Sequence, residues 1–329
     1  MKHFTFHRRL ALAAAAAGLL AALPAHAQGS WPDGKPIKII VPYGAGGSVD
    51  AIGRTLAQEL TTRLNTPVVV ENRTGAGSNV GSTYVAKAPP DGHTLLLTSP
   101  GNAINVTLFK QMPYDVRTEL TQVAVVGRAP GIALVKADSP INSVKDLVAA
   151  AKKDPEKLNY STSGNGSAPH LGAALFSQLT GARMTHVPYR GGSLAIQSVM
   201  AGDTQLTFGT SPSVLPMASG GRLRAIAVST RERSPLVPDL PGMREAGLPE
   251  YHLEFWYGVF LPAATPPAIA KKIFDATVTA MQQPAVKSSL AREGTEVSVS
   301  ASPEQFASFL VEDGKFWVGL VRSANVKVD

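Results

Sequence analysis

The sequence feature that most limits the possible folds of this chain is a repeated pattern. It consists of a short apolar run, then a turn rich in glycine and serine, then a segment with the apolar spacing of a helix. The turns occupy residues 42–50, 71–81 and 161–170, and apolar runs at residues 38–41 and 67–70 precede the first two. Short strands that alternate with helices build parallel sheets covered by helices on both faces. The sequence therefore predicts an α/β protein.

The same alternation continues along the rest of the chain. Further strands are expected at residues 94–97, 122–126, 132–135, 185–189, 206–208, 224–228 and 254–260, and helices at residues 168–178, 193–201, 269–281 and 303–323. Two stretches, residues 127–131 and 229–238, have the composition of connections between compact regions. They predict a discontinuous first lobe, residues 28–128 and 230–329, and a continuous second lobe, residues 129–229.

The N-terminus has the pattern of an exported protein. Three basic residues lie within the first nine, residues 10–23 are apolar, and Ala25, His26 and Ala27 supply the small residues of a cleavage site. The apolar run is shorter than the ~20 residues that a membrane span needs. The pattern is typical of a cleavable signal peptide over residues 1–27 and predicts an exported protein.

Composition excludes several classes of site. The chain has no cysteine, so it has no disulfide framework, thiolate nucleophile or cysteine zinc site. The formal net charge of +7 is scattered, without the basic runs and interleaved aromatic residues of a nucleic-acid-binding protein. After the predicted leader, the four histidines, His93, His170, His186 and His252, lack the spacing of metal ligands. We expect no metal, no cofactor and no nucleic-acid partner.

The first turn, residues 42–50, contains glycines at positions 44, 46 and 47. Glycine lets a backbone approach a ligand, and the following helix N-terminus adds positive potential, so such turns can bind anions. A dinucleotide fingerprint would need a third glycine at Val49, and a P-loop would need a Gly-Lys-Ser/Thr sequence. The sequence contains neither. A tight turn capped by Asp50 is the alternative interpretation.

The second and third turns have the same strand–turn–helix arrangement. In the second, position 80 lacks the glycine of a nucleotide fingerprint, and a capped turn packed against its neighbour is the favoured interpretation. The third turn offers four hydroxyls, two glycines and an asparagine, followed by Pro169 in the first helical turn. Such donors suit a carboxylate better than a metal, although a solvated loop is the alternative. Without a G-x-S-x-G sequence, Ser163 and Ser167 are poor nucleophile candidates.

Taken together, the chain resembles the Bug family, the periplasmic substrate-binding components of tripartite tricarboxylate transporters. The resemblance covers nearly the whole mature chain. It rests on VPY with GG and D (41–50), VENR with GAG (70–77), APPDG (88–92), SG with GS and HL (163–171), HVPYRGG (186–192), PDLP (238–241), EAG (245–247) and FWYG (255–258). The chain departs from the usual family pattern at Ala45 and Thr74, which stand where proline is common.

The resemblance implies a fold and a site. The implied fold is α/β: a two-lobed periplasmic-binding-protein fold (type II, Venus flytrap) with mixed, mostly parallel sheets flanked by helices. The first and third turns would face each other across a cleft and hold a carboxylate through backbone amides and hydroxyls. The residues that the resemblance assigns to ligand binding are Tyr43, Gly46, Gly47, Ser48, Val49, Asp50, Asn79, Ser99, Ser163, Gly164, Asn165, Gly166, Ser167, Tyr189 and Gly191.

The expected function is capture of a small organic anion: a mono-, di- or tricarboxylate or a related acid. The resemblance implies delivery of that ligand to the membrane permease subunits of a tripartite tricarboxylate-type transporter by a monomer without catalytic activity. Two alternatives stay open. One is an exported serine hydrolase that uses Ser163 or Ser167 with His170 or His186. The other is a ligand sensor for a membrane signalling protein.

Overall fold

The structure of the protein is a computed structural model that describes residues 31–108, 111–218 and 220–323. The chain separates into two compact units, Met1–Asp33 and Gly34–Asp329. In the first unit only residues 31–33 are described, so the predicted signal peptide at residues 1–27 lies outside the described residues. Every helix and strand of the described residues belongs to the second unit.

The first group of strands contains the three strands nearest the N-terminus together with two strands from later in the chain. Its members are β1 (Ile37–Val41), β2 (Val68–Asn72), β3 (Thr94–Thr98), β4 (Leu120–Lys136) and β9 (Glu254–Pro262), in the spatial order β2-β1-β3-β9-β4. β1 lies parallel to β2 and β3, whereas β9 is antiparallel to β3 and β4. Ile39, Ile40 and Val41 are buried, as expected for the apolar run before the first turn.

A second group of strands continues the sheet from β4. Its members are β5 (Asn159–Thr162), β6 (Thr185–Pro188), β7 (Leu206–Thr210) and β8 (Leu223–Val228), and the order is β4-β7-β5-β6 with β8 also paired to β4. β5 is parallel to β6 and β7, whereas β7 and β8 are antiparallel to β4. The sheet is therefore mixed.

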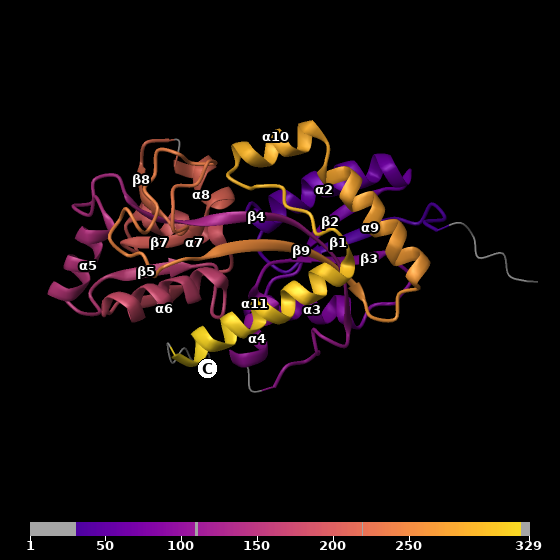
Figure 1. The fold of residues 1–329 in the computed structure, drawn as a ribbon, viewed down its shortest axis with the longest axis horizontal. Helices are drawn as coiled ribbons and strands as arrows, with labels where there is room; N and C mark the ends of the chain where they lie inside the picture. Colours follow the sequence, from indigo (N-terminus) through magenta and orange to yellow (C-terminus); the bar gives the residue numbers. More distant parts are fainter. Residues whose placement is uncertain (1–30, 109–110, 219, 324–329) are drawn as a thin grey trace, which may run out of the picture. The chain divides into compact units, whose positions relative to one another are not determined.

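Strand β4 carries the chain across residues 127–131, where the sequence predicted a connection between two strands. The structure has one continuous strand there in place of the two that were expected, because Arg128 pairs with Trp256 of β9 and exchanges backbone hydrogen bonds of 2.8 Å with Glu296. These partners keep the segment extended, and two irregularities in the β4–β9 register let it bend. Figure 1 shows β4 and β9 extending side by side between the two strand groups.

Helices occupy most of the segments between the strands. They are α2 (Ser48–Leu64), α3 (Asn79–Ala86), α4 (Gly101–Leu108), α5 (Val144–Lys153), α6 (Ala168–Thr180), α7 (Gly192–Ala201), α8 (Ser211–Ala218), α9 (Pro267–Met281), α10 (Pro284–Arg292) and α11 (Pro303–Ser323), with the short 3-10 helix η1 at Ala76–Ser78. Ile52, Leu56 and Leu60 of α2 are fully buried, as expected for a segment with the apolar spacing of a helix. Among the described residues, no helix combines the length and apolar character that crossing a bilayer requires.

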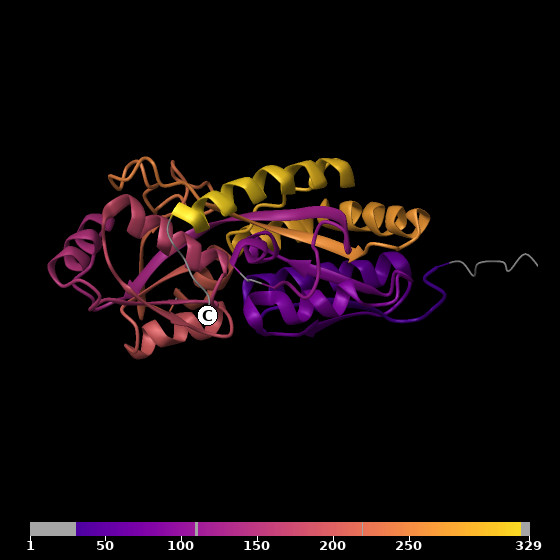
Figure 2. The same cartoon turned by 90° about the horizontal axis from the view of Figure 1, so that it is seen from below.

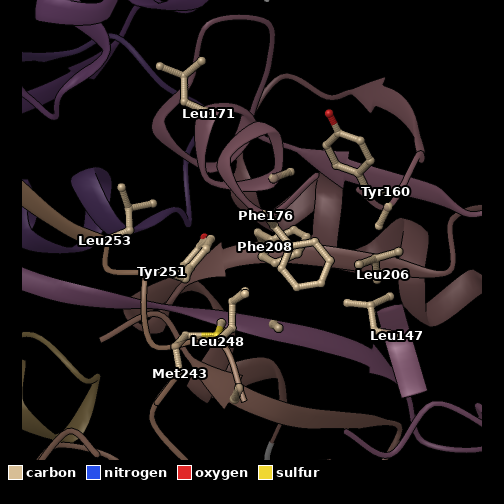
Figure 3. Close-up of a cluster of buried hydrophobic side chains, with 14 of the residues drawn as sticks. Leu147, Tyr160, Leu171, Phe176, Leu206, Phe208, Met243, Leu248, Tyr251 and Leu253 are labelled. Carbon is tan, nitrogen blue, oxygen red and sulfur yellow. The ribbon is translucent and has the colours of Figure 1, made fainter. Parts of the chain in front are cut away.

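An aromatic cluster forms the core of the second strand group (Figure 3). The rings of Phe176 in α6 and Phe208 in β7 have centroids 5.4 Å apart, and Tyr251 meets Phe176 edge-on at 6.4 Å. Met243 and Leu248 belong to the same buried cluster. Met243, Leu248 and Tyr251 come from the segment between β8 and β9, so that segment packs with the second strand group.

The predicted lobe boundaries stay a prediction, and the packing suggests one change to them. We propose that residues 230–253 belong with the second lobe, residues 129–229, because their apolar side chains join the core around Phe176. The sequence assigned them to the first lobe because it placed the connection between the lobes at residues 229–238.

Helix α11 lies along β4 and β9 (Figure 2). Trp256 of β9 and Trp317 of α11 donate their indole N–H groups to the same Oδ2 atom of Asp313, at 2.8 and 3.0 Å. Phe306 of α11 packs edge-on against Trp256, with centroids 5.8 Å apart. Burial raises the pKa of Asp313 to about 6, because the charged carboxylate loses hydration.

Candidate functional site

The first turn connects β1 to α2, and the carboxylate of Asp50 organises it. That carboxylate is buried and accepts hydrogen bonds from the Gly46 N–H at 2.9 Å, from Arg54 at 2.9 and 3.0 Å, and from Asn72 Nδ2 at 2.9 Å. Burial raises the pKa of Asp50, but the hydrogen bonds outweigh burial and hold this pKa below its ordinary value. Gly46 has a φ of +75°, which favours glycine there.

The third turn connects β5 to α6, and neutral groups organise it. Ser167 caps α6 by accepting a hydrogen bond from the His170 N–H at 3.4 Å. The Gly166 N–H donates to Nδ1 of His170 at 3.2 Å, so that ring nitrogen is an acceptor. The ring of His186 stacks on His170 with centroids 3.9 Å apart, and its Nε2 lies 2.6 Å from Thr162 Oγ1.

Burial keeps both imidazoles uncharged. It lowers the pKa of His170 to about 4. It also lowers the pKa of His186 to about 3, with a further contribution from repulsion by His170. At neutral pH the stack is therefore an uncharged support for the turn.

The first and third turns meet at a pocket, which we call the inner pocket. It is lined by Tyr43, Gly44, Gly47, Ser48, Val49, Ser99, Ser163, Ser167, Ala168, Pro169, Gly192, Ala195, Thr207, Phe208, Gly209, Thr210, Ser213, Phe255 and Tyr257. These residues include the starts of four helices: α2 at Ser48, α6 at Ala168, α7 at Gly192, and α8 through Ser213 in its first turn. A helix N-terminus carries partial positive charge, so four of them favour an anion.

A second pocket, the outer pocket, adjoins the inner one. It is lined by Pro42, Tyr43, Thr74, Gly75, Ala76, Gly77, Ser78, Ser163, Gly164, Asn165, Ser167, Pro188, Tyr189 and Arg190. Tyr43, Ser163 and Ser167 line both pockets. The outer pocket is therefore built from the second and third turns and from the end of β6.

Turns from the two strand groups approach each other closely at two glycines. A methyl group added to Gly44 would lie 2.6 Å from the carbonyl oxygen of Arg190, and one added to Gly77 would lie 2.7 Å from that of Asn165. Real side-chain carbons do not come so close to a backbone oxygen. These glycines are therefore required where the first and second turns contact the opposite strand group.

Hydrogen bonds also join the two strand groups around the inner pocket. The Ser48 N–H donates to Ser213 Oγ at 3.1 Å, and Thr210 Oγ1 donates to Ser48 Oγ at 3.0 Å. Ser193 Oγ donates to the carbonyl oxygen of Gly46 at 2.7 Å. The start of α2 is thus bonded to elements that follow β6 and β7.

The structure brings together ten of the residues that the resemblance assigned to ligand binding. The inner pocket contains Tyr43, Gly47, Ser48, Val49, Ser99, Ser163 and Ser167, and the outer pocket adds Gly164, Asn165 and Tyr189. Gly46, Asp50, Asn79, Gly166 and Gly191 line neither pocket. For every one of these residues, contact with a ligand stays a prediction.

Several residues outside both pockets have partners that explain their position. Asp50 and Gly46 bond to each other within the first turn, and Gly166 bonds to His170. Asn79 Oδ1 accepts a hydrogen bond from Asn105 Nδ2 at 2.9 Å. These residues shape the turns that line the pockets.

The inner pocket also contains residues that sequence reasoning missed. Thr210 and Ser213 lie where β7 ends and α8 begins, a strand–turn–helix junction like the first three. The Thr-Ser-Pro-Ser sequence at residues 210–213 was a signal that could have found them. Phe255 and Tyr257 lie inside β9 and carry no local signal, because only tertiary pairing brings that strand to the pocket.

The side chains that line the inner pocket are uncharged. None of its lining residues is Asp, Glu, Lys, Arg or His, whereas Arg190 lines the outer pocket. Among the described residues, no group of three or more His, Cys, Asp and Glu side chains could hold a metal ion. The inner pocket can therefore offer an anion helix N-termini and hydroxyl groups, without a cationic side chain.

Comparisons with known proteins identify similar chains. Residues 52–326 match the family model described as "Tripartite tricarboxylate transporter family receptor". The chain is 34% identical over 296 residues to Protein BugT of Bordetella pertussis, covering 89% of this chain and 90% of that one.

Two solved structures from Rhodopseudomonas palustris are similar over their whole length. Rpa4515 with adipate is 30% identical, with a TM-score of 0.87 and coverage of 90% of this chain and 99% of that one. MatC with bound malate is 29% identical, with a TM-score of 0.83 and coverage of 87% and 98%. The expected two-lobed α/β fold of periplasmic binding proteins is confirmed.

Proposed function

This chain belongs to the tripartite tricarboxylate transporter receptor family, and from that premise we propose that it captures a small carboxylate in the inner pocket. The observation that carries the proposal is the convergence of four helix N-termini on a pocket lined by uncharged residues. Each N-terminus stabilises a nearby negative charge by about 0.3–2 kcal/mol. Hydrogen bonds to a carboxylate are charge-assisted and stronger than those to a neutral group.

The class of ligand follows from this chemistry and from the relatives. A carboxylate has two oxygens and several lone pairs, which match the hydroxyls of Ser48, Ser163, Ser167 and Thr210 around the pocket. Similar chains have been seen with adipate and with malate, both of which are carboxylates. We propose a mono-, di- or tricarboxylate or a related organic anion as the ligand.

The proposed role is delivery to a membrane transporter. A ligand held between the two strand groups would favour the closed arrangement, because it binds that arrangement better than an open one. Membrane permease subunits of a tripartite tricarboxylate-type transporter would recognise the closed form of a monomeric, periplasmic protein. A ligand sensor for a membrane signalling protein is the second role, and capture of membrane partners by the loaded protein separates the two.

We propose that the protein has no catalytic activity, and the hydrogen bonds of the histidines support this. Nδ1 of His170 accepts from the Gly166 N–H, and Nε2 of His186 is bonded to Thr162. The partners of these two nitrogens are thus Gly166 and Thr162, and not Ser163 or Ser167, the hydroxyls that a serine hydrolase would need to activate. Hydrolysis of ester substrates by the purified protein would contradict the proposal.

A charge-reversal experiment tests the binding site. Gly47 lines the inner pocket and has a φ of −87°, so Gly47→Glu is compatible with the backbone and places a carboxylate where the ligand is expected. In the wild type, a carboxylate at 100 times its Kd adds about 2.7 kcal/mol to the free energy of unfolding and raises Tm. Thermal-shift and calorimetric titrations should show that Gly47→Glu loses this response.

The matched control is Gly314→Glu in α11, where an added Cβ atom meets nothing within 4 Å. It should bind the same carboxylate as the wild type does. Unchanged affinity in Gly47→Glu would contradict the proposed site, whereas loss of affinity in both variants would indicate a general effect of added negative charge.

A further inference from the structure

Tyr257 reaches the inner pocket from inside a strand. It pairs with Gly127 of β4 and is fully buried. Successive side chains of a strand point to opposite faces. Accordingly, Phe255 and Tyr257 line the pocket, whereas Trp256 packs against Phe306 of α11. The position of the Tyr257 ring is thus fixed by the β4–β9 pairing.

The hydroxyl group of Tyr257 has no hydrogen-bond partner among the residues that the structure describes. Burial raises the pKa of Tyr257 to about 12, although the nearby hydroxyls of Ser48 and Thr210 lower it. The phenol therefore keeps its proton at neutral pH and is available as a donor. Burying a hydroxyl without a partner is unfavourable, and buried polar groups in proteins are usually paired.

Three other hydroxyls surround this part of the pocket. Thr210 Oγ1 donates to Ser48 Oγ at 3.0 Å and lies 3.2 Å from Ser213 Oγ, which also accepts from the Ser48 N–H. An oxygen that accepts a hydrogen bond still carries its own O–H donor. We call Ser48, Thr210, Ser213 and Tyr257 the hydroxyl cluster. The starts of α2 and α8 add positive potential to it.

The hydroxyl cluster is separate from the other polar lining of the pocket. Tyr43, Ser163 and Ser167 line the inner and the outer pocket, whereas all four residues of the cluster line the inner pocket alone. The remaining lining includes the apolar side chains of Phe208 and Phe255. The inner pocket thus presents two sets of donors together with apolar surface.

We propose that the Tyr257 hydroxyl donates a hydrogen bond to a second acceptor group of the solute and makes the pocket select dicarboxylates over monocarboxylates. This inference rests on the proposed function, because it takes the first carboxylate to bind the donors shared with the outer pocket. A monocarboxylate would leave the Tyr257 hydroxyl unpaired, and such a site discriminates against the ligand that lacks the acceptor.

Matched acids and a matched variant test the proposal by calorimetry on the purified protein. The pairs are succinate with butyrate, glutarate with pentanoate, and adipate with hexanoate, which differ only in the second carboxylate. The wild type should bind a dicarboxylate at least 10-fold more tightly than its partner. Tyr257→Phe keeps the ring and removes the hydroxyl, so it should bind that dicarboxylate about 10-fold less tightly and the monocarboxylate unchanged.

A control and a ligand-free measurement separate a binding role from a structural one. The hydroxyl of Tyr251 is also buried, but it donates to the Gly172 carbonyl oxygen at 3.1 Å and lies outside the pocket. Tyr251→Phe should lower the ligand-free Tm and leave the preference between acids intact. Tyr257→Phe should not lower the ligand-free Tm, because its hydroxyl has no partner there.

The outcomes distinguish the two proposals. If the wild type binds none of the six acids, the proposed function fails. If the wild type binds a dicarboxylate and Tyr257→Phe binds it equally well, only the role of Tyr257 is overturned. An equal loss of affinity for both members of a pair, or a lowered ligand-free Tm in Tyr257→Phe, would also overturn it.

Discussion

The first and third turns both present a helix N-terminus to the inner pocket, but different chemistry holds each in place. In the first turn a buried carboxylate, Asp50, binds a guanidinium and a backbone N–H. In the third turn stacked, uncharged imidazoles of His170 and His186 bond to the turn's backbone and to Thr162. One turn therefore depends on a group that must be charged, and the other on groups that must be neutral.

This difference shows that a binding turn needs its backbone fixed, and that either kind of support can fix it. Neither support places a charge in the inner pocket, because Asp50, His170 and His186 do not line it. The pocket stays neutral while its surroundings hold the donors in place. The two turns should consequently respond differently to acid, to truncation of their supports and to loss of their caps.

The largest expected difference is the response to acid. The pKa of His170 and that of His186 are lowered by burial to about 4 and about 3, whereas the ordinary value is 6.5. Between the lowered pKa of each histidine and its ordinary pKa of 6.5, the unfolded chain binds more protons than the folded chain. The free energy of unfolding therefore falls as pH drops below 6.5. The loss between pH 7 and pH 5 should be about 2 kcal/mol per histidine, measured by urea unfolding.

The first turn should respond only in stronger acid. The pKa of Asp50 lies below its ordinary value of 3.8, so its contribution is present above pH 3.8 and is lost below it. His170→Asn should reduce the loss between pH 7 and pH 5, whereas the exposed control His252→Asn should not. The pKa of Asp313 is raised to about 6, so this residue stabilises the fold as pH falls, equally in the wild type and in both variants. The difference in free energy of unfolding between the wild type and His170→Asn therefore reports on His170 alone. An equal loss in His170→Asn would contradict this interpretation.

Truncating the support of the first turn should have the next largest effect. Asp50→Ala removes the acceptor of the Gly46 N–H and the partner of Arg54. We expect a loss of about 2–4 kcal/mol, below that of a fully buried ion pair because the Arg54 side chain is 57% exposed. Glu59→Ala breaks a pair with Arg63 in the same helix whose carboxylate is 28% exposed, against 4% for Asp50, and should cost less than about 1 kcal/mol. Equal losses in denaturant titrations would contradict the special role of Asp50.

A smaller effect should come from the contact between the first turn and the segment after β6. Gly44→Ala forces a methyl group to within 2.6 Å of the Arg190 carbonyl oxygen, so the two must separate. Overpacking of this kind costs about 1–3 kcal/mol, so we expect about 5- to 150-fold weaker binding of a carboxylate that the wild type binds. Gly220→Ala, where the added methyl meets nothing within 4 Å, is the matched control and should bind normally.

The smallest effect should come from the cap of the third turn. Ser167→Ala removes the oxygen that accepts from the His170 N–H, at a cost of about 1 kcal/mol. Ser143→Ala removes the corresponding cap of α5, where Ser143 Oγ accepts from the Asp146 N–H at 3.1 Å. Both variants should lose similar stability in thermal melts, but only Ser167→Ala should weaken ligand binding. Equal affinities would place Ser167 outside the binding surface.

Local patterns predicted the elements around the site well. The apolar spacing of the helix after the first turn, the start of α6 at Ala168 and the place of Pro169 in its first turn all agree with the sequence interpretation. These features depend on residues within one or two helical turns of each other, so spacing along the chain determines them. The strands expected on either side of residues 127–131 are one strand in the structure, because Arg128 is held extended by Trp256 and Glu296, both more than a hundred residues away.

The sequence by itself determined that this chain builds strand–turn–helix units with exposed amide and hydroxyl donors, because turn chemistry and capping act between neighbouring residues. Only the tertiary structure decided which donors share a pocket. In the tertiary structure the Asp50 carboxylate accepts a hydrogen bond from the Gly46 N–H and supports the first turn, and Tyr257 in β9 lines the same pocket as Ser48. The physical reason is that strand pairing fixes which distant side chains meet, and no local pattern records that pairing.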